Sequence, residues 1–114
     1  NQKRLRQILD TSAPPTAVFF TNYLSAMGGL SAINSLRLNV PDDISLVCFD
    51  NDPLFRAMHT SMTCVAQDLK AIGTTASRLL MQRISGDYDN FPATAMVDVQ
   101  FCSGKSVRNL HTGR

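Results

Sequence analysis

The segment from Val40 to Asn51 constrains the fold more than any other part of this chain. It opens with Val-Pro-Asp-Asp, which is typical of a tight turn because proline fixes φ and aspartate side chains bond nearby backbone N–H groups. Residues 44–49 then form a short apolar run, which favours a strand covered on both faces of a parallel sheet. The run ends on Asp50. Ligands of open α/β sheets bind beyond the carboxyl ends of the strands, so Asp50 stands where a ligand-contacting carboxylate is expected.

Helical and strand patterns alternate along the rest of the chain. We expect helices over residues 2–9, 23–37 and 69–84, and strands over residues 16–20, 44–49, 63–65 and 95–101. Asp68 is expected to cap the long third helix and Gly86 to end it. This alternation predicts an α/β fold with a doubly wound parallel sheet. We expect the polar residues 103–114 to form a frayed tail.

Composition excludes several classes of protein. A chain of 114 residues is one domain at most, and 44% hydrophobic against 18% charged residues argues against disorder. No apolar run approaches the roughly 20 residues that span a bilayer, and we expect neither a signal peptide nor a membrane partner. The net charge of +2 is too small to indicate nucleic-acid binding by this segment.

The cysteines point to a reducing compartment. Cys48, Cys64 and Cys102 are far apart in sequence, odd in number and without a Cys-x-x-Cys pair, so we expect no disulfide framework and a cytoplasmic protein. His59 and His111 share no ligand spacing with them, so we expect no metal and no cofactor.

Three segments carry a resemblance to a known family. Val-Pro-Asp-Asp-Ile-Ser-Leu-Val-Cys-Phe-Asp-Asn at 40–51 resembles a segment of the LacI/GalR family of bacterial transcriptional regulators. Pro-Thr-Ala-Val-Phe-Phe-Thr-Asn at 15–22, followed by Ala-Met-Gly at 26–28, is similar to a second family motif, and Met-Thr-Cys-Val-Ala-Gln at 62–67 is similar to a third. The three stand in family order and at family spacing over roughly residues 14–100.

The resemblance implies a fold and a role. It implies a type I periplasmic-binding-protein-like domain of two α/β lobes with a ligand cleft between them, of which residues 1–114 form part of the C-terminal lobe. It implies a ligand-sensing and dimerising part of a regulator, with a sugar-like effector controlling operator binding allosterically. DNA would be bound by an N-terminal domain that lies outside this chain.

Two polar residues are implied effector contacts. The family positions that match Asn22 and Asp50 contact polar atoms of the effector, and an amide and a carboxylate together fix a hydroxylated ligand. The alternative is that Asn22 caps a helix and Asp50 caps a turn. Tyr23, Cys48 and Cys102 depart from the family pattern, which leaves the identity of the effector open.

The dimer contact is implied for three apolar residues. Met27 on the second expected helix, with Phe55 and Met58 before the third strand, matches the region through which family dimers pair. The alternative is ordinary core packing, in which methionine fills gaps.

Catalysis has little support in this sequence. We find no G-x-S-x-G elbow, P-loop or G-x-G-x-x-G, and we expect no catalytic residue. A periplasmic sugar-binding protein of an ABC transporter, a flavodoxin-like enzyme and a pure dimerisation module remain alternatives.

Overall fold

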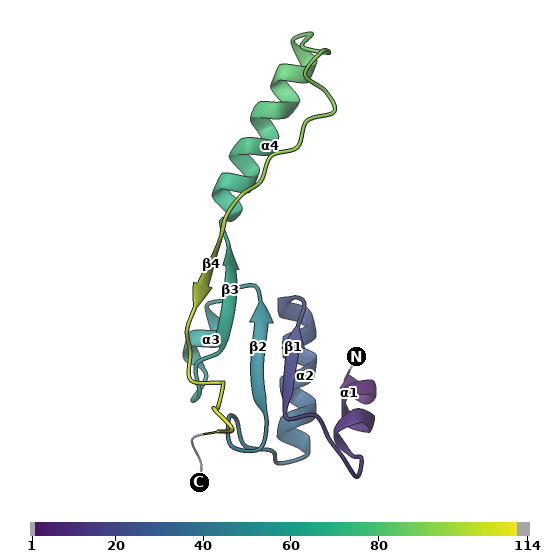
Figure 1. Cartoon of the computed structure of the whole chain (residues 1–114), viewed down its shortest axis with the longest axis vertical. Coiled ribbons are helices and arrows are strands. Elements are labelled where there is room, and N and C mark those ends of the chain that lie inside the picture. Colours follow the sequence, from purple (N-terminus) through teal and green to yellow (C-terminus); the bar gives the residue numbers. More distant parts are fainter. Residues whose placement is uncertain (1, 112–114) are drawn as a thin grey trace. The chain divides into compact units, whose positions relative to one another are not determined.

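The computed structural model describes residues 2–111, which fall into two compact units (Figure 1). Of the described residues, the first unit, which we call the sheet unit, comprises 2–66 and 101–111. The second, the helix unit, comprises residues 67–100. The chain therefore leaves the sheet unit once and returns to it.

The sheet unit is built on four strands in the order β1-β2-β3-β4. The strands are β1 (Ala17–Phe20), β2 (Ser45–Phe49), β3 (Thr63–Gln67) and β4 (Val99–Cys102). β1, β2 and β3 are parallel, with Phe20 opposite Cys48 and Cys48 opposite Cys64. Figure 1 shows β4 running in the opposite direction to β3. The α/β fold and three parallel strands are as predicted, but the sheet is mixed, so the prediction of a wholly parallel sheet is wrong for its last strand.

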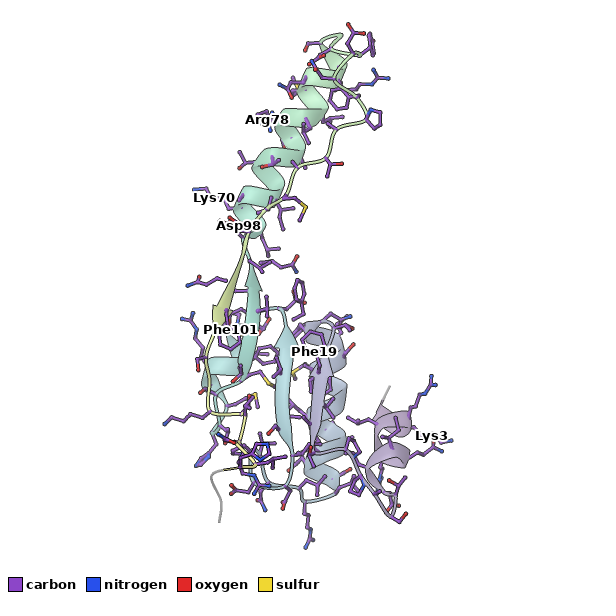
Figure 2. The ribbon with its side chains drawn as sticks, in the orientation of Figure 1. Lys3, Phe19, Lys70, Arg78, Asp98 and Phe101 are labelled. Atoms are coloured by element: carbon purple, nitrogen blue, oxygen red, sulfur yellow. The ribbon has the colours of Figure 1, made fainter. Side chains whose placement is uncertain are left out.

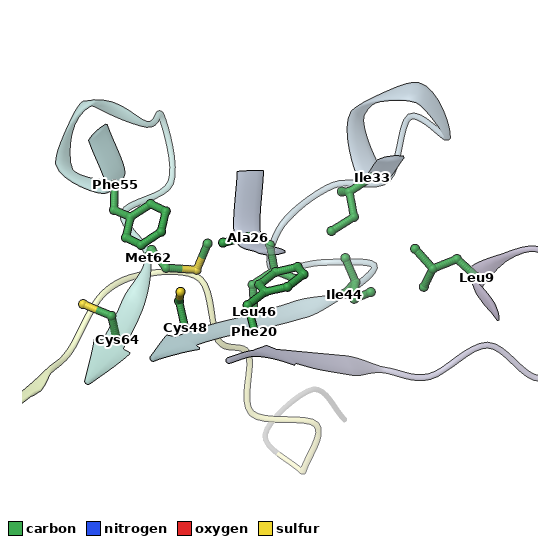
Figure 3. Packing of buried hydrophobic residues seen from close by; sticks show 10 residues of the cluster. All are labelled: Leu9, Phe20, Ala26, Ile33, Ile44, Leu46, Cys48, Phe55, Met62 and Cys64. Carbon is green, nitrogen blue, oxygen red and sulfur yellow. The ribbon is translucent and has the colours of Figure 1, made fainter. Parts of the chain in front are cut away.

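Three helices belong to the sheet unit. They are α1 (Gln2–Leu9), α2 (Tyr23–Ser35) and α3 (Leu54–Ala57). Figure 3 shows Ile33 of α2 and Phe55 of α3 packed in one cluster with Leu46 and Cys48 of β2. Burial of such side chains is the main driving force for folding. The core therefore lies between this face of the sheet and the helices.

The opposite face of the sheet is less covered. Phe19 of β1 lies opposite Val47 of β2 and remains 56% exposed, and Phe101 of β4 is 66% exposed (Figure 2). Val47 itself is half-buried. The expected burial of the second strand on both faces is thus met on one face within the described residues, because the core helices gather on that side.

The helix unit contains α4 (Leu69–Ile84) and the segment that returns from it. Asp68 accepts a hydrogen bond from the Ala71 N–H at 2.8 Å, and Gly86 stands beyond the helix with φ of +99°. Both helix boundaries are as predicted. The Arg83 guanidinium lies 4.2 Å from the centre of the Tyr88 ring, so a cation–π contact fastens the turn that follows.

Apolar side chains of α4 lie against the returning segment without being buried by it. Ile72, Ala76 and Leu79 line a hollow with Ala95 and Val97 of the returning segment. None of the α4 side chains is buried. The predicted strand over residues 95–101 forms only from Val99 onward. No helix within residues 2–111 is long and apolar enough to cross a membrane.

The residues after β4 are ordered along the sheet unit. The Lys105 N–H donates to the Ser61 carbonyl at 2.8 Å, and the Arg108 N–H donates to the Ser45 hydroxyl at 3.0 Å. The prediction of a frayed tail from residue 103 is therefore wrong for residues 104–108, since hydrogen bonds to distant strands hold a segment whose composition is polar. Residues 112–114 lie outside the described residues.

Candidate functional site

Asp50 follows β2 directly, at the carboxyl edge of the sheet. Its φ is +118°, a region that favours glycine and costs other residues about 1–3 kcal/mol. Its carboxylate Oδ2 accepts a hydrogen bond from the Tyr23 backbone N–H at 3.1 Å. Asp50 therefore joins the end of β2 to the first turn of α2, and its strained backbone is held by a contact 27 residues away in sequence.

Asn22 stands at the start of that same helix. Its backbone is extended, and its Oδ1 accepts from the Ser25 N–H at 2.8 Å and from the Ser25 hydroxyl at 2.9 Å. This is helix N-capping, which satisfies a backbone donor that the helix leaves unpaired. Asn22 has no hydrogen bond through its side-chain nitrogen among the described residues. The capping role expected as an alternative is present, and the amide NH₂ is the end that remains for a ligand.

The structure brings the two polar candidates together, because Asp50 bonds the residue next to Asn22. They come from different strand ends of a parallel pair, and parallel strands end at the same edge of a sheet. Their chemistry is complementary: a carboxylate accepts hydrogen bonds, and an amide nitrogen donates them. Such a pair suits a ligand with neighbouring hydroxyl or ring nitrogen atoms.

The pKa of the Cys48 thiol, near the end of the same strand, is strongly raised. Cys48 lies two residues before Asp50 with no exposed surface. Burial, followed by the Asp50 carboxylate and the Cys64 thiol, raises the pKa of Cys48 to about 11. Burial and the nearby carboxylate therefore both favour the protonated form of this thiol.

A separate hollow of about 260 Å³ lies between α1, β1 and α2. Thr21 and Ser25 are on its wall, but neither Asn22 nor Asp50 lines it. Because its other walls are mainly apolar residues of α1 and β1, we do not assign the polar site to it. No group of three His, Cys, Asp or Glu side chains within residues 2–111 could hold a metal ion.

The three apolar candidates for a dimer contact differ in exposure. Met27 on α2 is 41% exposed, and Leu24 one turn earlier is 77% exposed. Met58 is half-buried and packs against the core. Phe55 is only 2% exposed, with its ring centroid 6.1 Å from that of Tyr23. Phe55 is therefore a core residue whose side chain is not available to a partner. The side chains left for the predicted dimer contact are those of Met27 and Met58, together with Leu24.

Sequence reasoning missed Ser106 as a structural residue. Its side chain is fully buried, and its hydroxyl accepts from the Thr63 N–H at 2.8 Å and donates to the Leu46 carbonyl. One hydroxyl thus bridges β2 and β3. A lone serine in a polar tail gives no local signal of this, since the partners are 43 and 60 residues away.

Comparison with known proteins identifies a family. Residues 1–107 match the periplasmic binding protein-like domain. The HTH-type transcriptional repressor CytR of Escherichia coli K12 is 37% identical over 86 residues, which are 75% of this chain and 25% of that protein. The chain thus spans about a quarter of the length of the curated relatives it matches.

Solved structures show the same fold. The lac repressor dimer bound to operator and the anti-inducer ONPF superposes with a TM-score of 0.78 and 26% identity, covering 92% of this chain and 36% of that one. The complex of the transcriptional regulator CelR with cellobiose gives a TM-score of 0.81 and 25% identity, covering 92% of this chain and 32% of that one.

Proposed function

This chain belongs to the periplasmic binding protein-like domain family, in the form carried by LacI-type transcriptional regulators, and from that premise we propose that it senses a small effector for such a regulator. The effector binds at the carboxyl edge of the sheet, against Asp50 and Asn22. The chain forms part of the C-terminal lobe. The other wall of the cleft and the DNA-binding domain are supplied by parts of the protein outside this chain.

The hydrogen bond from the Tyr23 N–H to the Asp50 carboxylate carries this proposal. A residue held at φ of +118° at the end of a buried strand is expensive for stability, and such strain clusters at functional sites. The carboxylate also stands next to an amide that caps the neighbouring helix. Because both groups face a strand edge where ligands of open α/β sheets bind, a ligand role explains the strained aspartate.

A sugar-like metabolite fits this pair of groups. Hydroxyl groups of a sugar donate to a carboxylate and accept from an amide nitrogen. The CelR structure in complex with cellobiose supports this ligand class. CytR is named a repressor, which favours regulation over the transporter alternative and over catalysis.

Effector binding acts on DNA by shifting an equilibrium between two arrangements of the protein. An effector shifts it only as far as it binds one arrangement more tightly than the other. Two copies associate through a surface that includes the exposed Met27 and the half-buried Met58, as the dimeric lac repressor structure suggests. We place the protein in the cytoplasm, where its operator lies.

A thermal-shift screen of the full-length protein against sugars, sugar phosphates and purines tests the site. A ligand that binds only the native state raises the melting temperature. We expect Asp50→Asn, which keeps an acceptor for the Tyr23 N–H, to abolish the shift. Asp42→Ala is the matched control, because Asp42 is an exposed carboxylate in the turn before the same strand.

The outcomes of this screen test the assigned site independently of the family membership. A shift that Asp50→Asn leaves unchanged would reject the site while leaving the family membership intact. A confirmed ligand that does not alter operator affinity in a DNA-binding titration would reject the allosteric role.

A further inference from the structure

The three cysteines, far apart in sequence, lie on neighbouring strands. Cys48 of β2 is the register partner of Cys64 of β3, and Figure 3 shows both in the same packed cluster. β3 and β4 are neighbours in the sheet, and the Lys105 N–H donates to the Ser61 carbonyl just beyond them. Continued along two antiparallel strands, this register places Cys102 opposite Cys64. Sulfur atoms of three strands therefore gather in the sheet unit, and all three residues are reduced cysteines.

The three thiols are not equivalent. Cys48 has no exposed surface, and its thiol donates to the Phe49 carbonyl at 3.4 Å. Cys64 is 2% exposed, and burial, then the neighbouring Cys102, raises its pKa. Cys102 is half-buried, so it is the most accessible residue of the three. An oxidant from solvent therefore meets Cys102 first.

A metal does not explain this arrangement. No set of three potential ligands in residues 2–111 has the geometry to hold an ion. Simple apolar packing explains Cys48, which is sealed in the core. It does not explain why a partly exposed cysteine of the edge strand lies beside a buried cysteine of the next strand.

We propose that Cys64 and Cys102 form an oxidation site, at which a hydroperoxide converts the pair into a reversible disulfide between β3 and β4. The reaction starts at the thiolate of Cys102, which attacks one peroxide oxygen, breaks the O–O bond and becomes a sulfenic acid while water leaves. Cys64 then attacks that sulfur, the S–O bond breaks, and a second water leaves as the S–S bond forms.

The balance of this reaction is closed. Two thiols and one hydrogen peroxide give one disulfide and two waters; the sulfurs lose two electrons, and the peroxide gains them. A dithiol reductant reverses the step by thiol–disulfide exchange. Cys64 needs no solvent access of its own, because its reaction partner is the neighbouring oxidised sulfur.

The effect of this disulfide follows from the order of β3 and β4 along the chain. β3 precedes the helix unit and β4 returns from it, so the disulfide closes residues 65–101 into one covalent loop. Cross-linking a loop of this length restricts the unfolded chain, and stabilisation grows with the length of the loop. We therefore expect the oxidised protein to melt at a higher temperature than the reduced one.

Peptide mapping of the full-length protein tests the proposal. The reduced protein is treated with hydrogen peroxide, the remaining thiols are blocked, and trypsin is added without reductant. The three cysteines fall on separate tryptic peptides, residues 38–56, 57–70 and 84–105. We expect peptide 57–70 linked to peptide 84–105, and loss of the link after dithiothreitol. A link between peptides 38–56 and 57–70 instead, or oxygen added to Cys102 without any link, would overturn the assignment.

Two variants sharpen the result. Cys48→Ala should retain the link, because Cys48 takes no part in it. Cys102→Ser should lose the link and leave Cys64 unmodified at the same exposure, since the accessible thiol is gone. If Cys64 oxidises as fast in Cys102→Ser as in the parent, the order of attack proposed here is wrong.

Discussion

Asp50 holds two elements together and is the proposed effector contact. Its positive φ is unfavourable, yet its carboxylate bonds the Tyr23 N–H and so fixes the start of α2 against the end of β2. A glycine would relieve the strain but would supply no carboxylate. The hydrogen bond that the carboxylate accepts therefore explains an aspartate here better than the backbone conformation does.

Cys48 makes stability depend on pH in the alkaline range. Folding raises the pKa of its thiol from 9.0 to about 11, so the native state binds the proton more tightly than the unfolded state does. The contribution is fully present below about pH 9 and is lost as the pH rises toward 11. It is of the order of 3 kcal/mol, because the pKa rises by about two units and each unit corresponds to about 1.4 kcal/mol.

Chemical unfolding measured from pH 8 to 11 checks this contribution. We expect the free energy of unfolding to fall over that range in the parent protein. Cys48→Ala should flatten the profile, even though the lost volume lowers stability at every pH. Equal slopes in the two proteins would contradict the assignment to Cys48.

At the scale of elements, the adjacent glycines of α2 have different reasons to be there. A Cβ added at Gly29 would collide with the Phe20 ring, whereas a Cβ added at Gly28 meets nothing within 4 Å. The close approach of Phe20 explains why a glycine is needed at position 29. Gly28 is half-buried and has no such neighbour.

Alanine substitution separates the two glycines. We expect Gly29→Ala to destabilise the protein by about 1–3 kcal/mol, because overpacking forces Phe20 or the helix to move. Gly28→Ala should stabilise it by up to about 1 kcal/mol through helix propensity. Urea unfolding of both variants measures the difference, and a Gly29→Ala variant as stable as the parent would contradict the close contact.

The segment after β4 joins β2 and β3 through hydrogen bonds of one serine. Ser106 satisfies the Thr63 N–H and the Leu46 carbonyl at once. We expect Ser106→Ala to cost about 1–3 kcal/mol, since it leaves buried polar groups without partners. Ser103→Ala is the matched control, because Ser103 is exposed and exposed substitutions stay within about 0.5 kcal/mol. Equal melting temperatures for the two variants would show that the bridge carries no stability.

At the scale of the whole molecule, the exposed apolar side chains of α2 bear on association. Leu24 and Met27 lie one turn apart and are 77% and 41% exposed. We expect Met27→Asp in the full-length protein to weaken the dimer, because association would bury an unpaired charge. Ser12→Asp adds the same charge on an exposed loop and should leave the dimer intact.

Sedimentation over a range of concentrations measures this association. The expected result is dissociation of Met27→Asp at concentrations where the parent and Ser12→Asp remain dimeric. Unchanged sedimentation of Met27→Asp would remove this face of α2 from the proposed interface.

The local pattern of the sequence was sufficient to predict most of the helices and strands. Apolar spacing predicted α2 and α4, and turn chemistry predicted the start of β2, because these signals lie within a few residues of one another. The same pattern predicted Asp68 and Gly86 as the boundaries of α4. Three motifs in register were enough for the family, and they placed Asn22 and Asp50 as candidate ligand contacts that stay predictions.

Tertiary structure alone decided the features that depend on distant partners. The ordered residues after β4 and the bridge at Ser106 rest on hydrogen bonds between residues more than 40 positions apart. The reversed direction of β4 depends on the strand beside which it lies. The burial of Phe55 and the meeting of Cys64 with Cys102 likewise depend on which strands become neighbours. Local propensity carries no information about such pairs, because a side chain's partner across a sheet is set by topology and register.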